Sequence, residues 1–191
     1  MDREIGRLLE AWRDRDRTLI VVTADHGEAF GEHGEVGHSI FVYDTTLHVP
    51  LIIAGAGVPA TVNVDAPVTL ADIAPTIVGW AKVPLMDADG IDLRPLIDGG
   101  RPGARALYAE SFAPLLDFGW APLRSLRRDG VKLIAAPRPE LYELEKDPAE
   151  QENVIGARAD LARDLTARVE RISGPELPAR DAAMDADVVA R

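Results

Sequence analysis

The chain has 191 residues, of which 47% are hydrophobic, and its formal net charge at pH 7 is -11. This hydrophobic content predicts a folded globular protein, while the negative charge argues against nonspecific binding to nucleic acid or to an anionic membrane surface. The absence of cysteine excludes disulfides and thiolate metal sites. No apolar run approaches the roughly 18 residues that a membrane-spanning helix needs.

The first 54 residues predict one helix and two buried strands. Apolar residues at helical spacing predict a charged amphipathic helix over residues 2–15 that packs by one face and is not a signal peptide; they are Ile5, Leu8, Leu9 and Trp12. The apolar run 18–23 predicts a buried strand, which we expect to be parallel because polar residues do not alternate with apolar ones. A second buried strand is predicted over residues 49–54.

Residues 24–48, between these strands, predict a long loop with short turns. The segment contains four glycines, Gly27, Gly31, Gly34 and Gly37. It also contains every histidine of the chain, which are His26, His33, His38 and His48. Few other segments carry residues suited to chemistry, so this loop is the first candidate for a site.

The rest of the chain predicts helices first and then a small antiparallel sheet. Helices are predicted over residues 70–80 and 93–97. Strands are predicted over residues 106–110, 123–128, 131–135 and 140–144, with Asp129-Gly130 as a hairpin signal and a helix following over 157–172. The expected class is therefore α/β, with a core over residues 1–104, a small sheet with one helix over 105–172, and a tail or linker over 173–191.

A parallel sheet of two strands would be a poor core. The two apolar strands of the core therefore call for neighbouring strands that this sequence does not supply. The simplest interpretation is that the chain is the C-terminal part of a longer protein.

Asp25 and His26 follow directly on the first strand and are the strongest ligand candidates. The carboxyl edge of an open α/β sheet is where sites are usually built. A carboxylate next to an imidazole suits Zn, Mn or Fe, whereas a carboxylate-rich set of ligands would suit Ca or Mg. The alternative is a surface turn with a capping aspartate and a solvated histidine, which the buried strand and the nearby histidines make the weaker interpretation.

The other polar residues of the loop support this site in several ways. Glu28 is a candidate for supporting the metal ligands from behind or for capping the loop. His33 is expected to fix the loop by hydrogen bonds rather than to bind metal. His38 is the better candidate for contact with substrate, where an imidazole stabilises an anionic ester or protonates a leaving oxygen; a role as a further metal ligand stays open. His48 is expected to be a structural hydrogen bonder.

Several segments, in the same order, resemble the C-terminal half of the catalytic domain of sulfatases, within the alkaline phosphatase superfamily. The first is TADHGEAFGEHGEVGHSIFVYDTTLHVPLII, which begins at Thr23. The later matching segments are residues 68–80, 90–96, 131–134, 140–144 and 147–153. Together they cover about residues 1–155, which makes the resemblance far more specific than Asp-His-Gly alone.

The resemblance implies an alkaline-phosphatase-like core in which Asp25 and His26 bind a divalent cation, usually calcium in sulfatases and manganese or zinc in relatives. It also places His38 where many sulfatases carry a lysine that grips the sulfate and the leaving oxygen. The charge of this contact then depends on protonation, which leaves the choice between sulfate, phosphate and phosphonate esters open.

The nucleophile of sulfatases has no counterpart here. The family uses a cysteine or serine in a Cys/Ser-x-Pro-x-Arg motif, and the chain contains no cysteine and no Ser-x-Pro-x-Arg. That motif lies in the N-terminal half of sulfatases, so the missing half of the same protein is the implied partner, and we expect this chain alone to be inactive.

The expected function is hydrolysis of a small-molecule or glycan sulfate ester by the complete, metal-dependent enzyme. One alternative is a phosphodiesterase or phosphonate monoester hydrolase of the same superfamily. Another is a non-catalytic or incomplete domain. The family includes many exported enzymes, so an exported or periplasmic full-length parent is compatible with the resemblance.

Overall fold

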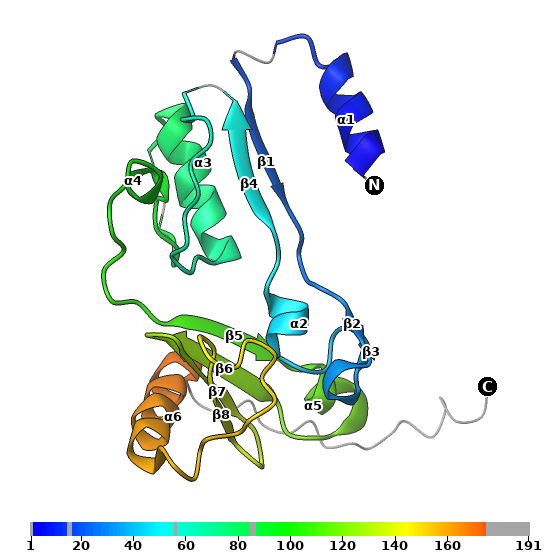
Figure 1. Cartoon of the computed structure of the whole chain (residues 1–191), viewed down its shortest axis with the longest axis vertical. Coiled ribbons are helices and arrows are strands. Elements are labelled where there is room, and N and C mark those ends of the chain that lie inside the picture. Colours follow the sequence, from blue (N-terminus) through cyan, green and yellow to red (C-terminus); the bar gives the residue numbers. More distant parts are fainter. Residues whose placement is uncertain (1, 15–16, 56, 85–86, 175–191) are drawn as a thin grey trace, which may run out of the picture. The chain divides into compact units, whose positions relative to one another are not determined.

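The computed structural model of the chain describes residues 2–14, 17–55, 57–84 and 87–174 (Figure 1). The chain divides into two compact units, and each is continuous in space but not in sequence. Unit 1 comprises Met1–Asp25 and Val49–Gly103, and unit 2 comprises His26–His48 and Ala104–Arg191. Residues 26–48, which we call the site loop, therefore group with the small sheet. The predicted core over residues 1–104 instead placed them with the strands that precede and follow them.

Two strands of unit 1 pair with each other along their whole length. They are β1 (Leu19–Thr23) and β4 (Leu51–Gly55), in a register that runs from Leu19↔Gly55 to Thr23↔Leu51. The pairing is antiparallel, so the predicted parallel arrangement is wrong. The site loop returns the chain to the neighbouring strand without the crossover that a parallel pair requires.

The prediction that both strands are buried is also wrong. Every residue of β1 and β4 is half-buried or exposed, and Ile52 is 58% exposed. Within the described residues each strand has a single neighbour, so one edge of each stays unpaired. An apolar, β-branched run predicts the strand itself but does not guarantee its burial.

The N-terminal helix, α1 (Asp2–Ala11), ends earlier than predicted and does not form the expected packing face. None of its residues is buried, and the side chain of Leu8 is 65% exposed. Trp12 follows the helix, and its Nε1 donates a 3.0 Å hydrogen bond to Thr18 Oγ1 just before β1. Helical spacing therefore predicted the conformation correctly but not the packing.

The helices predicted after β4 are confirmed as η3 (Leu70–Asp72) with α3 (Ile73–Ala81), and as α4 (Arg94–Ile97). Buried polar side chains join them. Asp72 is 0% exposed, and its Oδ1 accepts a 2.8 Å hydrogen bond from the Ile91 backbone N–H. Thr76 Oγ1 accepts a 2.8 Å bond from the Leu93 N–H. These bonds fix the segment before α4 against α3.

Unit 2 is built on a four-stranded antiparallel sheet in the order β5-β6-β7-β8, as predicted. The strands are β5 (Leu107–Ser111), β6 (Leu123–Arg128), β7 (Val131–Ala135) and β8 (Glu140–Glu143). Asp129 and Gly130 have positive φ values of 50° and 76°, which is the geometry that the predicted two-residue hairpin requires. A short helix that was not predicted, α5 (Ala113–Phe118), joins β5 to β6.

Successive residues of the sheet bury into two different clusters, because side chains alternate between the faces of a strand. Helix α6 (Ala159–Ser173) contacts β6 and β7 on one face (Figure 1). There Leu133 and Leu141 pack with Leu165 and Val169. Ala162 of the same helix also packs in this cluster, whereas Ile172 near the end of the helix is 51% exposed.

The site loop covers the other face. Its Val42 is 2% exposed and clusters with Ile134, Tyr142 and Leu144. The loop itself contains β2 (Ala29–Phe30), η2 (Glu32–Gly34), β3 (Val36–Gly37) and α2 (Asp44–Leu47). The site loop is therefore packed on a sheet formed more than 50 residues later in the chain.

Among the described residues, no helix has the length and apolar character needed to cross a membrane. Most of the predicted tail, from residue 175 onward, lies outside the described residues.

Candidate metal centre

Two short strands bring distant parts of the site loop together. β2 and β3 pair antiparallel through Ala29↔Gly37 and Phe30↔Val36. Glu28 directly precedes the first pair and His38 directly follows it, so this pairing places their side chains at the same end of the ribbon. His26 lies two residues before Glu28. Asp25, the last residue of unit 1, precedes His26 and is exposed.

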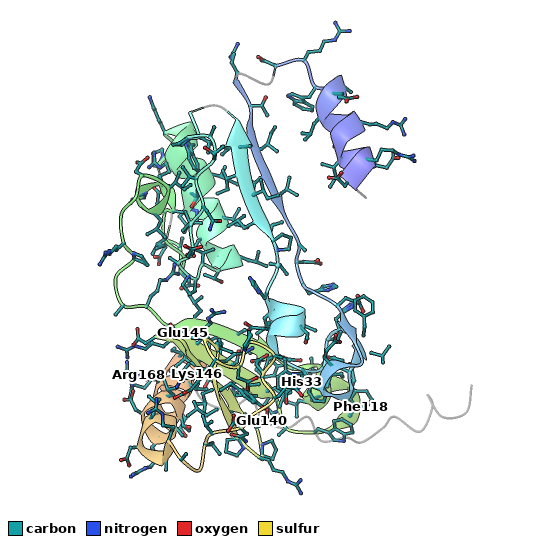
Figure 2. All side chains as sticks on the ribbon, in the orientation of Figure 1. His33, Phe118, Glu140, Glu145, Lys146 and Arg168 are labelled. Atoms are coloured by element: carbon teal, nitrogen blue, oxygen red, sulfur yellow. The ribbon has the colours of Figure 1, made fainter. Side chains whose placement is uncertain are left out.

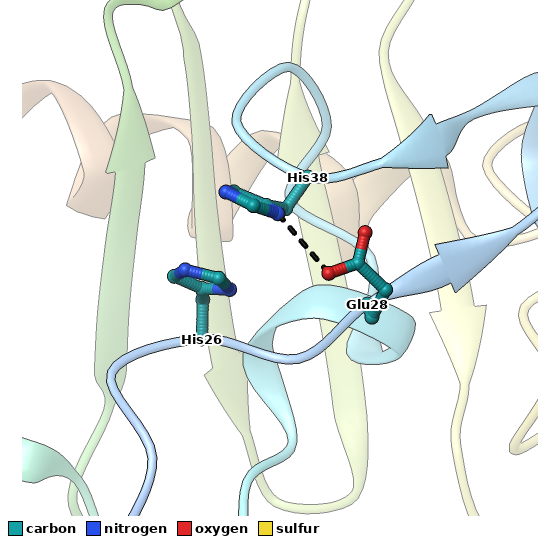
Figure 3. Close-up of side chains that lie close together, drawn as sticks. All are labelled: His26, Glu28 and His38. Carbon is teal, nitrogen blue, oxygen red and sulfur yellow. Dashed lines mark hydrogen bonds and ion pairs between the residues drawn. The ribbon is translucent and has the colours of Figure 1, made fainter.

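His26, Glu28 and His38, which we call the trio, each offer a ligand atom within 4.8 Å of the other two. The imidazole rings of His26 and His38 stack with centroids 3.7 Å apart and an angle of 22° between their planes. His38 Nδ1 lies 3.3 Å from Glu28 Oε2 (Figure 3). All three residues are exposed, so an ion could reach them from solvent.

Hydrogen bonds at Nδ1 orient both rings. His26 Nδ1 lies 2.8 Å from the Gly27 carbonyl oxygen, which can only accept, so this contact assigns the proton to Nδ1. The carboxylate of Glu28 assigns the proton of His38 in the same way. Each neutral ring then keeps the lone pair of Nε2 for a cation or a substrate, which is the usual arrangement of a metal-binding histidine.

Gly27 stands in the middle of the trio and has no room for a side chain. A Cβ at this position would lie 2.3 Å from the Thr45 carbonyl oxygen. The Gly27 N–H donates a 2.8 Å hydrogen bond to the Thr46 carbonyl oxygen. The backbone between His26 and Glu28 therefore contacts α2 directly, which requires glycine at position 27. The Asp-His-Gly sequence alone does not predict this contact.

Other contacts fix the turn that carries His38. Glu35 is 6% exposed, and its Oε1 accepts hydrogen bonds from the backbone N–H groups of Ile40 and Phe41 at 3.0 and 3.4 Å. Ser111 Oγ donates a 2.6 Å bond to the carbonyl oxygen of Ser39. The residue after His38 is thus tied to the end of β5.

His33 lies outside the trio and contacts the body of unit 2 (Figure 2). Its ring stacks on Tyr43 with centroids 3.6 Å apart, and its Nε2 lies 3.2 Å from the Ala149 carbonyl oxygen. These contacts join the site loop to the turn that contains Ala149, and the role of His33 in fixing the loop stays a prediction. His48 follows α2, is exposed and is not a member of the trio.

Tyr43 continues this anchor toward the sheet. Its hydroxyl donates a 2.7 Å hydrogen bond to Glu140 Oε2, and the Tyr142 hydroxyl donates to the same oxygen at 2.8 Å. Burial, and then the neighbouring carboxylate of Glu140, raise the pKa of both tyrosines well above the usual range. Both phenols therefore remain hydroxyl donors at neutral pH.

A buried ion pair that attaches the site loop to the sheet is not among the features predicted from the sequence. Lys132, which follows Val131 in an apolar strand, is 1% exposed and pairs with Asp44 and Glu150 at 2.7 and 2.8 Å. A lysine inside an apolar strand was the available signal, because a lysine is almost never buried unless it is paired.

The chain is similar in sequence to known sulfatases. The family model described as Sulfatase matches residues 1–83. Arylsulfatase K of Gallus gallus is 32% identical over 168 residues, which are 80% of this chain and 31% of that protein. The choline-sulfatase of Rhizobium meliloti (strain 1021) is 29% identical over 168 residues, 81% of this chain and 31% of that protein.

A solved structure is also similar. The phosphonate monoester hydrolase SpPMH from Silicibacter pomeroyi superposes with a TM-score of 0.71 at 31% identity, over 90% of this chain and 37% of that one. The chain thus spans about a third of the length of the curated relatives named above. The chain therefore resembles sulfatases in sequence, and its mixed helix-and-sheet architecture is of the alkaline phosphatase type.

Proposed function

We propose that this chain supplies metal ligands and a substrate-contacting histidine to a metal-dependent hydrolase of sulfate esters. The observation that carries the proposal is the clustering of His26, Glu28 and His38 within 4.8 Å. Two imidazoles and a carboxylate form a donor set of a kind suited to a divalent cation and an anionic ester, and Asp25 directly precedes His26 in the sequence. Similarity to the sulfatase family supports the same assignment.

Asp25 and His26 are the proposed metal ligands, and the donor chemistry fits. Sulfatases and phosphonate hydrolases of this superfamily use a divalent metal ion. When bound, such an ion polarises the ester and activates an oxygen nucleophile. Calcium, manganese and zinc are the candidate ions; an imidazole ligand favours the latter two.

His38 is the proposed substrate contact. Its Nε2, left with a lone pair by the Glu28 contact, would accept a proton when the ring is neutral and donate one when the ring is charged. As an imidazolium it would stabilise the negative charge of the ester and protonate the leaving oxygen. Glu28 would hold the ring in the required orientation.

A phosphonate monoester hydrolase is the second candidate function, favoured by the 31% identity to SpPMH over 90% of this chain. A histidine at position 38 would interact with a sulfate or a phosphonate oxygen in similar ways. Rates of hydrolysis of matched aryl sulfate and aryl phosphonate esters by the full-length parent would separate the two candidates. A higher kcat/KM for the sulfate would support the first.

The nucleophile of the complete enzyme is proposed to come from polypeptide outside this sequence, because no cysteine and no Ser-x-Pro-x-Arg occurs within it. We therefore expect the purified chain not to turn over substrate. Robust hydrolysis by the chain that is abolished in His26→Ala would overturn this expectation.

Calorimetry of the purified chain with Ca²⁺, Mn²⁺ and Zn²⁺ tests the metal ligands. Binding should be lost in Asp25→Ala and in His26→Ala, while His48→Ala is the matched control and should bind as wild type. Equal binding by all four proteins would contradict the assignment of Asp25 and His26. An absence of binding to a chain that still unfolds cooperatively would favour a non-catalytic domain or a site that requires further ligands.

A further inference from the structure

We infer that Lys132 is a positioning residue for the trio: it holds α2 in place through Asp44, and α2 in turn holds the backbone of Gly27 between His26 and Glu28. The inference deepens the proposed function, on which its importance for metal binding rests. The placement of the trio can nevertheless be measured without any metal or substrate.

Lys132 points to the face of the sheet that the site loop covers. Residues two apart in a strand share a face, and Ile134 lies in the cluster that contains Val42 of the loop. Lys132 Nζ lies 2.7 Å from Asp44 Oδ1. A residue of β7 thus contacts the first residue of α2 directly, across 88 positions of sequence.

The charges in this buried cluster balance. Glu150, whose side chain is 1% exposed, places Oε1 2.8 Å from Lys132 Nζ, and Arg127 lies 3.2 Å from Asp44 Oδ2. Among the described residues Glu150 Oε1 accepts no hydrogen bond, and the Lys132 ammonium faces its charge. Removing one partner of such a cluster leaves an uncompensated buried charge, whereas an apolar cluster of equal volume is often as stable.

Glu150 also fixes the backbone of α2. Its Oε2 accepts a 2.6 Å hydrogen bond from the Asp44 N–H. The side chain of Asp44 is held by Lys132 and its main chain by Glu150, so α2 has both a position and an orientation. This double attachment defines one placement of the helix on the sheet.

The contacts continue from α2 to the trio. The Thr46 carbonyl accepts the Gly27 N–H at 2.8 Å, and the Thr45 carbonyl would lie 2.3 Å from any Cβ at Gly27. A shift of α2 must therefore either break the Gly27 hydrogen bond or move Gly27 with it. His26 and Glu28, which flank Gly27, would then lose their alignment with His38.

The first test measures placement by NMR in Lys132→Met, which keeps the length of the side chain but removes its charge. The chain has four histidines, so contacts between ring protons are readily assigned. We expect the His26–His38 ring contact to disappear and the Gly27 amide to exchange faster than in wild type, because its hydrogen bond to Thr46 depends on the position of α2. Retention of both signals in folded Lys132→Met would overturn the inference.

Val169→Ala is the matched control. Val169 is 2% exposed and packs in unit 2 on the opposite face of the sheet, against α6 rather than the loop. It should lower the stability of unit 2 while the ring contact and the Gly27 exchange rate stay as in wild type. If Val169→Ala removes the ring contact as effectively, the effect is one of general stability and the inference fails.

Asp44→Asn addresses the case in which Lys132→Met does not fold. The variant keeps the volume of Asp44 and the pairing of Lys132 with Glu150 but weakens the hold on α2. It should change the ring contact in the same direction. An unchanged ring contact in this variant would also overturn the inference.

Titration with Mn²⁺ separates this inference from the proposed function. If wild type binds Mn²⁺, Lys132→Met should weaken binding about tenfold or more, and Val169→Ala should not. If wild type binds no divalent ion, this chain alone does not form the proposed metal site, while the ring contact and amide exchange still decide whether Lys132 positions the trio.

Discussion

The internal packing of unit 1 differs from that of unit 2. In unit 2 both faces of the sheet carry a hydrophobic cluster, one under α6 and one under the site loop. In unit 1 the strands β1 and β4 contain no buried residue, and buried polar side chains such as Asp72 join the helices. The comparison teaches that apolar composition alone does not make a core, because burial also requires elements on both faces of a strand.

The largest expected effect is on the free energy of unfolding, and it compares a core position of unit 2 with a strand position of unit 1. Leu133→Ala, at a site that is 0% exposed in unit 2, should lower the free energy of unfolding by about 2–5 kcal/mol, because it leaves a cavity. Leu51→Ala, in half-buried β4, should have a clearly smaller effect. Urea unfolding followed by hydrogen exchange of each unit measures both, and equal effects would show that the two units share one core.

A smaller effect is expected at the turn between β6 and β7. Gly130 has a φ of 76°, which a residue with a Cβ adopts at a cost of about 1–2 kcal/mol. Gly130→Ala should therefore destabilise unit 2 by about that amount without affecting unit 1. Gly156→Ala, where no atom lies within 4 Å of the new Cβ, is the control in the same unit and should be near neutral.

All three tyrosines lie in unit 2. Their ionisation at high pH should therefore change the stability of unit 2 and not that of unit 1. Burial, and then the Glu110 carboxylate, raise the pKa of Tyr108 to about 12, and the pKa values of Tyr43 and Tyr142 are raised further. A raised folded pKa stabilises the fold fully below the unfolded value of about 10 and loses this contribution as pH rises.

Unit 2 should consequently lose stability between about pH 10 and pH 12, with no change near neutrality. Tyrosinate absorbance followed with pH measures this, and Tyr108→Phe should remove the earliest ionisation. A simple, non-cooperative titration of all three tyrosines near pH 10 would show that the phenols are not buried as described.

The smallest effect is expected in the turn after β8. The N–H groups of Gln151 and Glu152 donate to Asp147 and lower the pKa of its carboxyl group. A lowered folded pKa stabilises above the unfolded value and is lost as pH falls through the folded one. Asp147→Asn should therefore reduce the loss of stability of unit 2 in acid, whereas Asp117→Asn, at an exposed aspartate of α5, should not.

Most of unit 2 could be predicted because local signals and packing agree there. The short strand candidates, the Asp129-Gly130 turn and the helical spacing of Leu161, Leu165 and Val169 each predict an element that the structure contains. Local pattern and tertiary contact point to the same answer, which is the condition under which a sequence specifies its structure.

Unit 1 and the supports of the site were less predictable. A β-branched run predicts a strand but not the strand it pairs with, so the predicted parallel pairing of β1 is wrong. The histidines of the loop are candidate site residues from the sequence alone, and they include His26 and His38. That Glu28 clusters with them follows only from the pairing of β2 with β3. The role of Lys132 depends on residues 88 and 18 positions away, and no local pattern encodes contacts at such separations.

The discontinuity of unit 2 has a consequence for biosynthesis. The site loop contacts partners that follow much later, with Asp44 bonded to Glu150 across 106 positions and His33 to Ala149 across 116. A ribosome releases the N-terminal segment first, so residues 26–48 must wait, without their final support, until the DPAEQEN turn has left the exit tunnel. Contacts of such long range slow folding. The trio should therefore be among the last features of this chain to form.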